Sequence, residues 1–145
     1  MLEGVARQNP THDTRAPITF NILITLLQAL EKVCLNSYEI CLFKAAFCLA
    51  FFGFLRVGEL TSKSLKSRDL RPLQFGDIAI VEANWCKHVE VTIRQSKTDQ
   101  LGHSSTLFLS ETRGQACPVM AVVNYLKVRA QGLGQGQFLV HFDSP

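Results

Sequence analysis

The sequence has 145 residues, of which 47% are hydrophobic and 19% charged, and its formal net charge at pH 7 is +3. A chain of this length and composition can bury the core of one ordinary domain and is too apolar to be disordered. The weak positive charge is compatible with an anionic partner but does not require one.

The five cysteines favour a reducing, intracellular compartment. They are odd in number and include no C-x-x-C pair, unlike a disulfide framework. Cys86 and His88 would be a start for a metal site, but no second ligand pair follows at zinc-like spacing, so we expect no metal. The charge-free run 45–55 is shorter than the roughly 20 residues of a membrane span, and no signal peptide is visible.

The first third of the chain predicts a tail and a helix. Residues 1–17 are rich in prolines and polar residues and are expected to be a linker. Thr19 is a candidate N-cap for a helix over residues 20–35. Four apolar side chains at helical spacing should share its buried face: Phe20, Leu23, Leu27 and Leu30.

A second helix, over residues 37–52, is expected to be the central buried one. Asn36 with Glu39 three residues later resembles a capping box, and the segment is apolar nearly all round. Gly53 should end or loosen this helix. A short third helix is expected to begin at Arg56.

From Leu73 onward the spacing of the apolar residues changes from that of a helix to that of a strand. Residues 75–83, 88–94 and 105–111 are predicted strands of an antiparallel meander. In the middle strand Val89, Val91 and Ile93 should face the core, and Glu90, Thr92 and Arg94 the other side. Pro118 should begin a fourth helix that ends near Gly132. The fold class expected for residues 18–145 is therefore α+β, a mostly helical core with the small sheet at one edge.

Arg56 and Glu59 are the first candidate site residues. A guanidinium directly after the most apolar segment must either reach the surface or meet an anion, because its burial without a partner is costly. The alternative is an ordinary ion pair on one helical turn, worth only a few tenths of a kcal/mol.

Further basic residues follow. Lys97 lies in a predicted hairpin turn, where an aimed lysine can act as a general acid, although polar turns often carry lysines. The segment between these candidates suits contacts with a phosphate backbone, or is a solvated basic loop; its basic residues are Lys63, Lys66, Arg68 and Arg71. Together these residues predict a site for a phosphodiester, since arginine can bind two phosphate oxygens and keeps its charge.

Two stretches resemble a known family. "AFFGFLRVGELT" is similar to the first conserved box of tyrosine recombinases, the phage-integrase-like enzymes that break and rejoin DNA, and "VTIRQSKTDQLGHSSTLFL" to their β-hairpin with its catalytic lysine. The short sequences "SKTDQ" and "CPV" are most similar to those in recombinases of DIRS-like and Crypton-like mobile elements. "LEGVARQNPT" resembles the junction that follows the family's core-binding domain, so residues 1–17 would be a linker from such a domain.

The resemblance implies roles for three residues. Arg56 would clamp the scissile phosphate, Glu59 would support Arg56, and Lys97 would protonate the leaving 5′ oxygen. The implied partner is the phosphate backbone of double-stranded DNA, on which family members self-associate. A nuclear location is expected, and no metal, small-molecule cofactor or membrane is implied.

The resemblance is limited to the N-terminal half of the family's catalytic domain. No His-x-x-Arg box and no nucleophilic tyrosine follow Lys97 in this sequence, and neither Tyr38 nor Tyr125 stands where the nucleophile would. The expected function is that of a DNA-binding fragment of a recombinase, inactive in strand cleavage alone. The alternative left open is a non-catalytic DNA-binding or protein-interaction module with the same fold.

Overall fold

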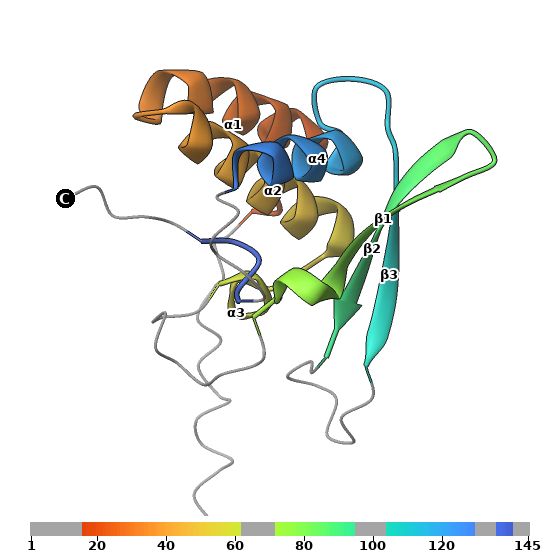
Figure 1. Ribbon diagram of the computed structural model, residues 1–145. Coiled ribbons are helices and arrows are strands. Elements are labelled where there is room, and N and C mark those ends of the chain that lie inside the picture. The colour runs from red at the N-terminus through yellow and green to blue at the C-terminus, as the bar shows by residue number, and fades with distance from the viewer. Residues whose placement is uncertain (1–15, 62–71, 95–103, 130–135, 141–145) are drawn as a thin grey trace, which may run out of the picture.

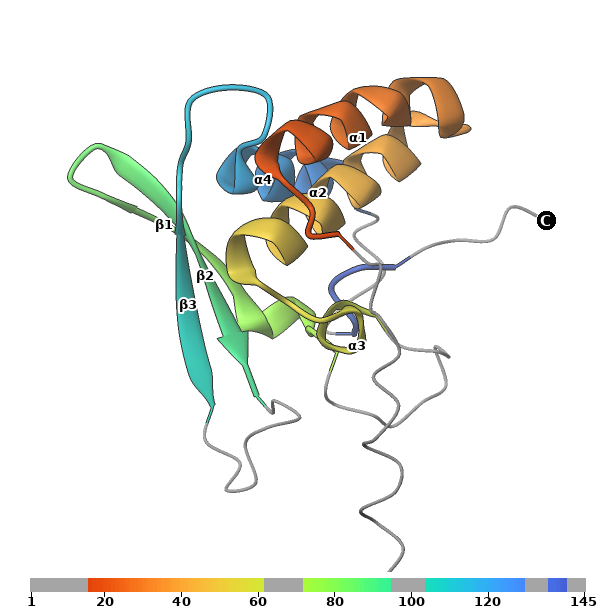
Figure 2. The same ribbon diagram turned by 180° about the vertical axis from the view of Figure 1, so that it is seen from behind.

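The computed structural model describes residues 16–61, 72–94, 104–129 and 136–140. These residues form an α+β fold in which three stacked helices lie on one side of a three-stranded antiparallel sheet (Figures 1 and 2). The helices α2 and α4 pack on each other and on the sheet, and α1 packs on the side of α2. The α+β class and the position of the sheet at one edge confirm the prediction.

Helix α1, Phe20–Val33, begins where its cap predicts. The Thr19 hydroxyl accepts a hydrogen bond from the backbone N–H of Ile22 at 3.4 Å. Of the four residues expected on the buried face, Leu23, Leu27 and Leu30 are buried. Phe20 is instead half exposed; it lies in the first turn of the helix, and its ring lies 6.2 Å from that of Phe51 on α2.

Helix α2, Ser37–Gly53, is the central helix of the described fold. The Asn36 side chain accepts a hydrogen bond from the backbone N–H of Glu39 at 2.9 Å, and the Glu39 carboxylate accepts one from the N–H of Leu35 at 2.8 Å. This arrangement satisfies two backbone donors at the start of the helix, much as the predicted capping box would.

The end of α2 is set by Phe54, which adopts the left-handed conformation with φ of 50°. Gly53 is the last helical residue and has a packing role: a Cβ atom added there would lie 3.1 Å from Cγ of Leu55. The reversal of the chain at Phe54 therefore brings Leu55 back onto the end of the helix.

The sheet runs in the order β1–β2–β3, with β1 at Ile78–Ala83, β2 at Cys86–Ile93 and β3 at Ser105–Ser110. Both pairings are antiparallel, so the predicted meander is confirmed. Val89, Val91 and Ile93 are buried as expected. The predicted first strand is shorter, because Phe75–Asp77 form a turn of 3-10 helix, η2, before it.

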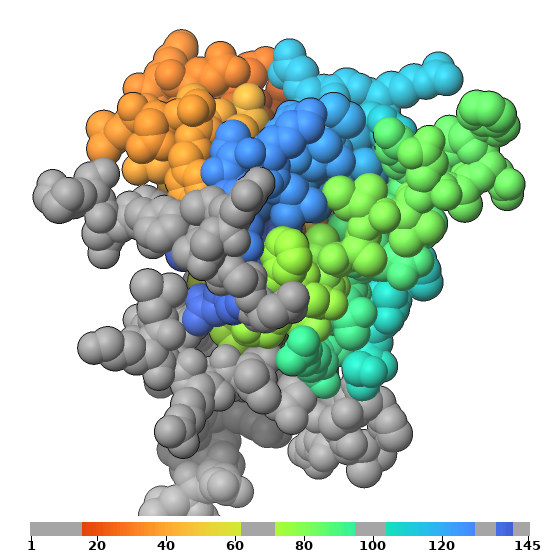
Figure 3. Space-filling model, viewed as in Figure 1, coloured from red at the N-terminus to blue at the C-terminus, as the bar shows by residue number. Residues whose placement is uncertain are grey.

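Helix α4, Pro118–Val128, begins with proline in its first turn and is capped by the thiol of Cys117, which accepts from the N–H of Met120. The helix ends earlier than predicted, at Val128, where Arg129 turns to an extended conformation. Residues 136–140 then lie against residues 72–77, with a β-bridge between Gln74 and Gln137 (Figure 3).

Residues 137–140 are held to the helical core by two tyrosines. The hydroxyl of Tyr125 donates to the carbonyl of Phe138 at 2.9 Å and accepts from the N–H of Val140 at 3.2 Å. Tyr38 donates to the Val140 carbonyl, and the two hydroxyl oxygens lie 3.4 Å apart. These side-chain hydrogen bonds add to the backbone hydrogen bonds that the segment makes with residues 73–75. None of the described helices is both long and apolar enough to cross a membrane.

Candidate nucleic-acid interface

Arg56 reaches the surface at the point where α2 gives way to α3, the single turn Val57–Leu60. After the reversal at Phe54, Leu55 is buried and the side chain of Arg56 is 55% exposed. The sequence predicted that this guanidinium would either reach the surface or meet an anion, and in the structure it reaches the surface.

Glu59 is the partner of Arg56, as the spacing predicts. One carboxylate oxygen, Oε2, accepts a hydrogen bond from the backbone N–H of Arg56 at 2.8 Å, and the other, Oε1, lies 4.0 Å from its Nη1. The Glu59 side chain is only 12% exposed. Because an ion pair with so exposed an arginine contributes little to stability, the main effect of Glu59 is to fix the backbone and orientation of Arg56.

The turn that carries Arg56 and Glu59 is held by backbone hydrogen bonds to a segment that is distant in sequence. The carbonyl of Glu59 accepts from the N–H of Leu73 at 2.7 Å, and the carbonyl of Leu73 accepts from the N–H of Phe138 at 2.8 Å. Leu60 and Leu73 are both buried. The position of Arg56 therefore depends on residues 72–75 and 136–138, which are distant from it in sequence.

The other sequence-predicted site residues lie outside the described residues. These are Lys97 and the basic set Lys63, Lys66, Arg68 and Arg71. What the structure does place is the elements on either side of Lys97 in sequence. The end of β2 and the start of β3 lie at the same end of the molecule as α3, at the bottom of both ribbon views (Figures 1 and 2).

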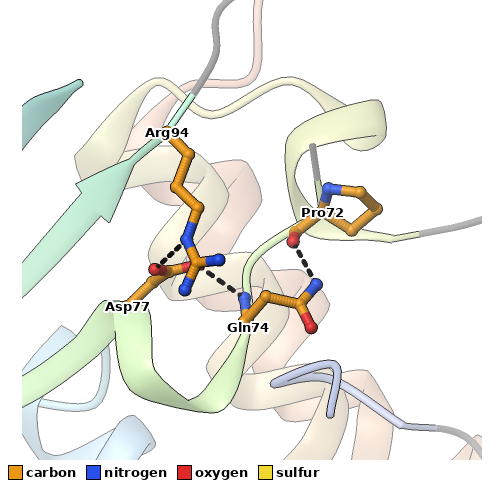
Figure 4. Close-up of polar contacts among 4 residues, drawn as sticks. All are labelled: Pro72, Gln74, Asp77 and Arg94. Atoms are coloured by element: carbon orange, nitrogen blue, oxygen red, sulfur yellow. Dashed lines mark hydrogen bonds and ion pairs between the residues drawn. The ribbon is translucent and has the colours of Figure 1, made fainter. Parts of the chain in front are cut away.

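Arg94, a residue to which the sequence assigned no role, also lies at this end. Its Nε bonds Oδ1 of Asp77 at 2.6 Å, directly after β2 (Figure 4). The other oxygen of Asp77 accepts from the N–H of Gln74 at 2.9 Å. The arginine side chain is 43% exposed whereas that of Asp77 is 5% exposed. An arginine next to the predicted hairpin was the only available signal, since its partner is 17 residues away.

Neither described tyrosine is presented as a nucleophile. Tyr125 is fully buried, and the hydroxyls of both tyrosines are bound within the fold as described above. Burial, reinforced by the hydrogen bond with Tyr125, raises the pKa of Tyr38 above its ordinary value.

An apolar groove of about 460 Å³ lies close to Arg56, and its walls include the neighbouring residues Leu55 and Val57. It lies between the start of α1 and the end of α2, and its walls include Ile18, Leu26, Phe47, Phe51, Phe54 and Val57. Phe54 is 91% exposed and Val57 76% exposed. Exposed apolar side chains grouped around a groove are a feature that contact surfaces share.

The described residues contain no group of three or more His, Cys, Asp or Glu side chains placed to hold a metal ion. In particular, the Nε2 atom of His88 lies 3.2 Å from Oε1 of Glu90, while Cys86 is exposed. Comparisons of the chain with protein-family models, with curated proteins and with solved structures return no match.

Proposed function

We propose that this chain binds the phosphate backbone of double-stranded DNA as part of a tyrosine-recombinase-like catalytic domain. The main support is the pairing of Arg56 with Glu59. An exposed guanidinium is oriented by a largely buried carboxylate that also holds its backbone. Guanidinium groups fixed in this way bind phosphate oxygens with little loss of conformational entropy.

The resemblance in sequence supplies the rest of the proposal. Lys97 would act with Arg56, as a general acid in a complete enzyme, and the basic residues of segment 62–71 would contact neighbouring phosphates. The helix α3 and the ends of β2 and β3 lie at the same end of the molecule, which is compatible with one shared site (Figure 1). Self-association on DNA and a nuclear location belong to the same proposal.

Binding without cleavage is the expected activity of this chain. Strand cleavage by this chemistry needs a tyrosine hydroxyl placed in line with the phosphorus atom, and the hydroxyls of Tyr38 and Tyr125 are bound inside the fold. Stabilising donors without that nucleophile leave most of the rate enhancement absent. Incubation with nicked duplex DNA should yield no covalent adduct; an adduct on either tyrosine would contradict the proposal.

The decisive experiment is the salt dependence of binding to a fluorescent DNA duplex. Each phosphate contact contributes about −0.9 to the slope of log affinity against log salt concentration. Arg56→Ala should reduce that slope by about one contact and weaken binding to unrelated duplexes alike. Lys44→Ala is a suitable control, because Lys44 lies on α2 in an ion pair with Glu31. If the affinity of the parent for the duplex does not change with salt concentration, the proposal that it binds the DNA backbone is wrong.

A protein-interaction module is the second candidate function, and the apolar groove favours it. The groove walls are hydrophobic and two of them, Phe54 and Val57, are almost fully in solvent. If the parent chain shows no affinity for DNA, the surface that needs a partner is this groove.

A further inference from the structure

We infer that Arg94 is a second phosphate-binding residue of the same site, held in position by Asp77. This inference rests on the proposed function and adds to it a residue that neither the motif comparison nor the sequence pattern assigned. The ligand is again a nucleic-acid backbone phosphate, and Arg94 acts as a binding residue without taking part in bond cleavage.

The fold holds Asp77 in one position beside Arg94. Its carboxylate is almost completely buried, and both of its oxygens are engaged, one by Nε of Arg94 at 2.6 Å and one by the N–H of Gln74 at 2.9 Å. The side-chain amide of Gln74 in turn donates from Nε2 to the carbonyl of Pro72 at 2.7 Å (Figure 4). A carboxylate fixed from two sides gives Arg94 a defined orientation.

Arg94 contacts Asp77 through its Nε atom. A guanidinium carries five N–H donors, and the contact with Asp77 is made by Nε, which has one of them. A pair that served only to satisfy Asp77 could use the two-pronged geometry common in Arg–carboxylate pairs. Contact through Nε leaves the terminal amino groups in a side chain that is 43% exposed. This is the geometry of an arginine that is positioned by one anion to bind another.

Arg94 and Arg56 are connected through the backbone of residues 73 and 74. Leu73 donates to the carbonyl of Glu59, which holds Arg56, and the next residue, Gln74, donates to Asp77, which holds Arg94. Residues 73 and 74 thus contact both of the acidic residues, Glu59 and Asp77, that orient the two exposed arginines. The shared segment links the backbone that carries Arg56 to the carboxylate that orients Arg94 before any ligand arrives, and preorganisation of this kind improves affinity by lowering the cost of ordering.

The location agrees with this assignment. Arg94 directly follows β2, and the end of β2 lies at the same end of the molecule as α3 (Figure 1). A DNA backbone that crosses this end would contact both Arg56 and Arg94 through its phosphates. Contacts of this kind position the duplex without reading its sequence.

The test is the salt dependence of duplex binding by charge-neutral variants. Arg94→Gln should lower the salt slope by about 0.9, so that the loss of affinity between 50 and 200 mM salt becomes about 3.5-fold smaller than in the parent. Lys87→Gln is the matched control, since Lys87 lies at the opposite end of the same strand, in an ion pair with Glu82. The control should bind as the parent does.

Two further variants separate binding from folding. Arg94→Gln leaves a buried carboxylate without its charged partner, so the double variant Arg94→Gln/Asp77→Asn removes both charges and should fold if the single variant does not. It should show the same reduced slope. Arg94→Lys should keep the slope but bind several-fold more weakly, because lysine has no Nε donor with which to be oriented by Asp77.

The outcomes distinguish the inference from the proposed function. If the parent does not bind DNA, the proposed function itself is wrong. If the parent binds and Arg56→Ala weakens it, whereas the folded Arg94 variants retain the parent slope, only the role given to Arg94 is wrong.

Discussion

Removal of a single buried hydroxyl, in Tyr125→Phe, should destabilise the protein substantially. The Tyr125 oxygen bonds the carbonyl of Phe138 and the N–H of Val140, and both residues are buried. Phenylalanine fills nearly the same space, so packing is retained and the loss is one of hydrogen bonding.

The magnitude follows from the groups left unpaired. A buried polar group without a partner costs about 1–3 kcal/mol, and two backbone groups lose their partner here. We expect the free energy of unfolding to fall by about 2–4 kcal/mol, which is a large part of the roughly 5–15 kcal/mol of a typical domain. Tyr38→Phe should cost only about 0.5–1.5 kcal/mol, because water can reach the half-buried site and replace the lost bond.

Urea denaturation of the parent and of the two variants measures these differences directly, at unchanged slope against urea concentration. Hydrogen exchange supplies a local readout, because the amide of Val140 loses its acceptor in Tyr125→Phe and should exchange faster. The reasoning is refuted if Tyr125→Phe is no more destabilising than Tyr38→Phe. In that case the hydroxyl network would not be what holds residues 137–140 to the core.

Two other predictions concern the end and the centre of α2. Phe54→Gly should raise the free energy of unfolding by about 0.5–1 kcal/mol in thermal denaturation, because glycine adopts the left-handed conformation without the penalty of a side chain; a loss of stability would show instead that the exposed ring packs usefully against the groove. Burial, with a contribution from the nearby Cys117, raises the pKa of Cys48 from 9.0 to about 11. The unfolded thiol therefore releases its proton first, so stability present below pH 9 should decline as the pH rises towards 11, by up to about 1.4 kcal/mol per pH unit. Cys48→Ala should lack this part of the decline, and an unchanged pH profile of the variant would contradict the assignment.

The elements of the fold were predictable where a local signal sets them. The caps Thr19 and Asn36 mark the starts of α1 and α2, and the alternation around Val91 marks β2. These signals act over three or four residues and need no knowledge of the rest of the chain. The antiparallel order of the strands followed because the connections between them are short.

The features that were missed depend on contacts between distant residues. Tyr38 and Tyr125 are 87 residues apart, and Arg94 and Asp77 are brought together by the register of β1 on β2. In the sequence, Arg94 was one of three polar residues on a strand face. Only the buried carboxylate beside it distinguishes it from an ordinary exposed arginine.

The position of Arg56 shows how a local conflict is resolved by backbone geometry. Leu42 and Leu49 are buried and seven residues apart, and Arg56 follows at the same interval. Had α2 continued, the guanidinium would have lain in line with them, in the core. A left-handed residue costs roughly 1–2 kcal/mol, less than the several kcal/mol required to bury an ion without a partner. The reversal at Phe54 is thus the less costly conformation, and its result is an arginine at the surface with its backbone held by Glu59.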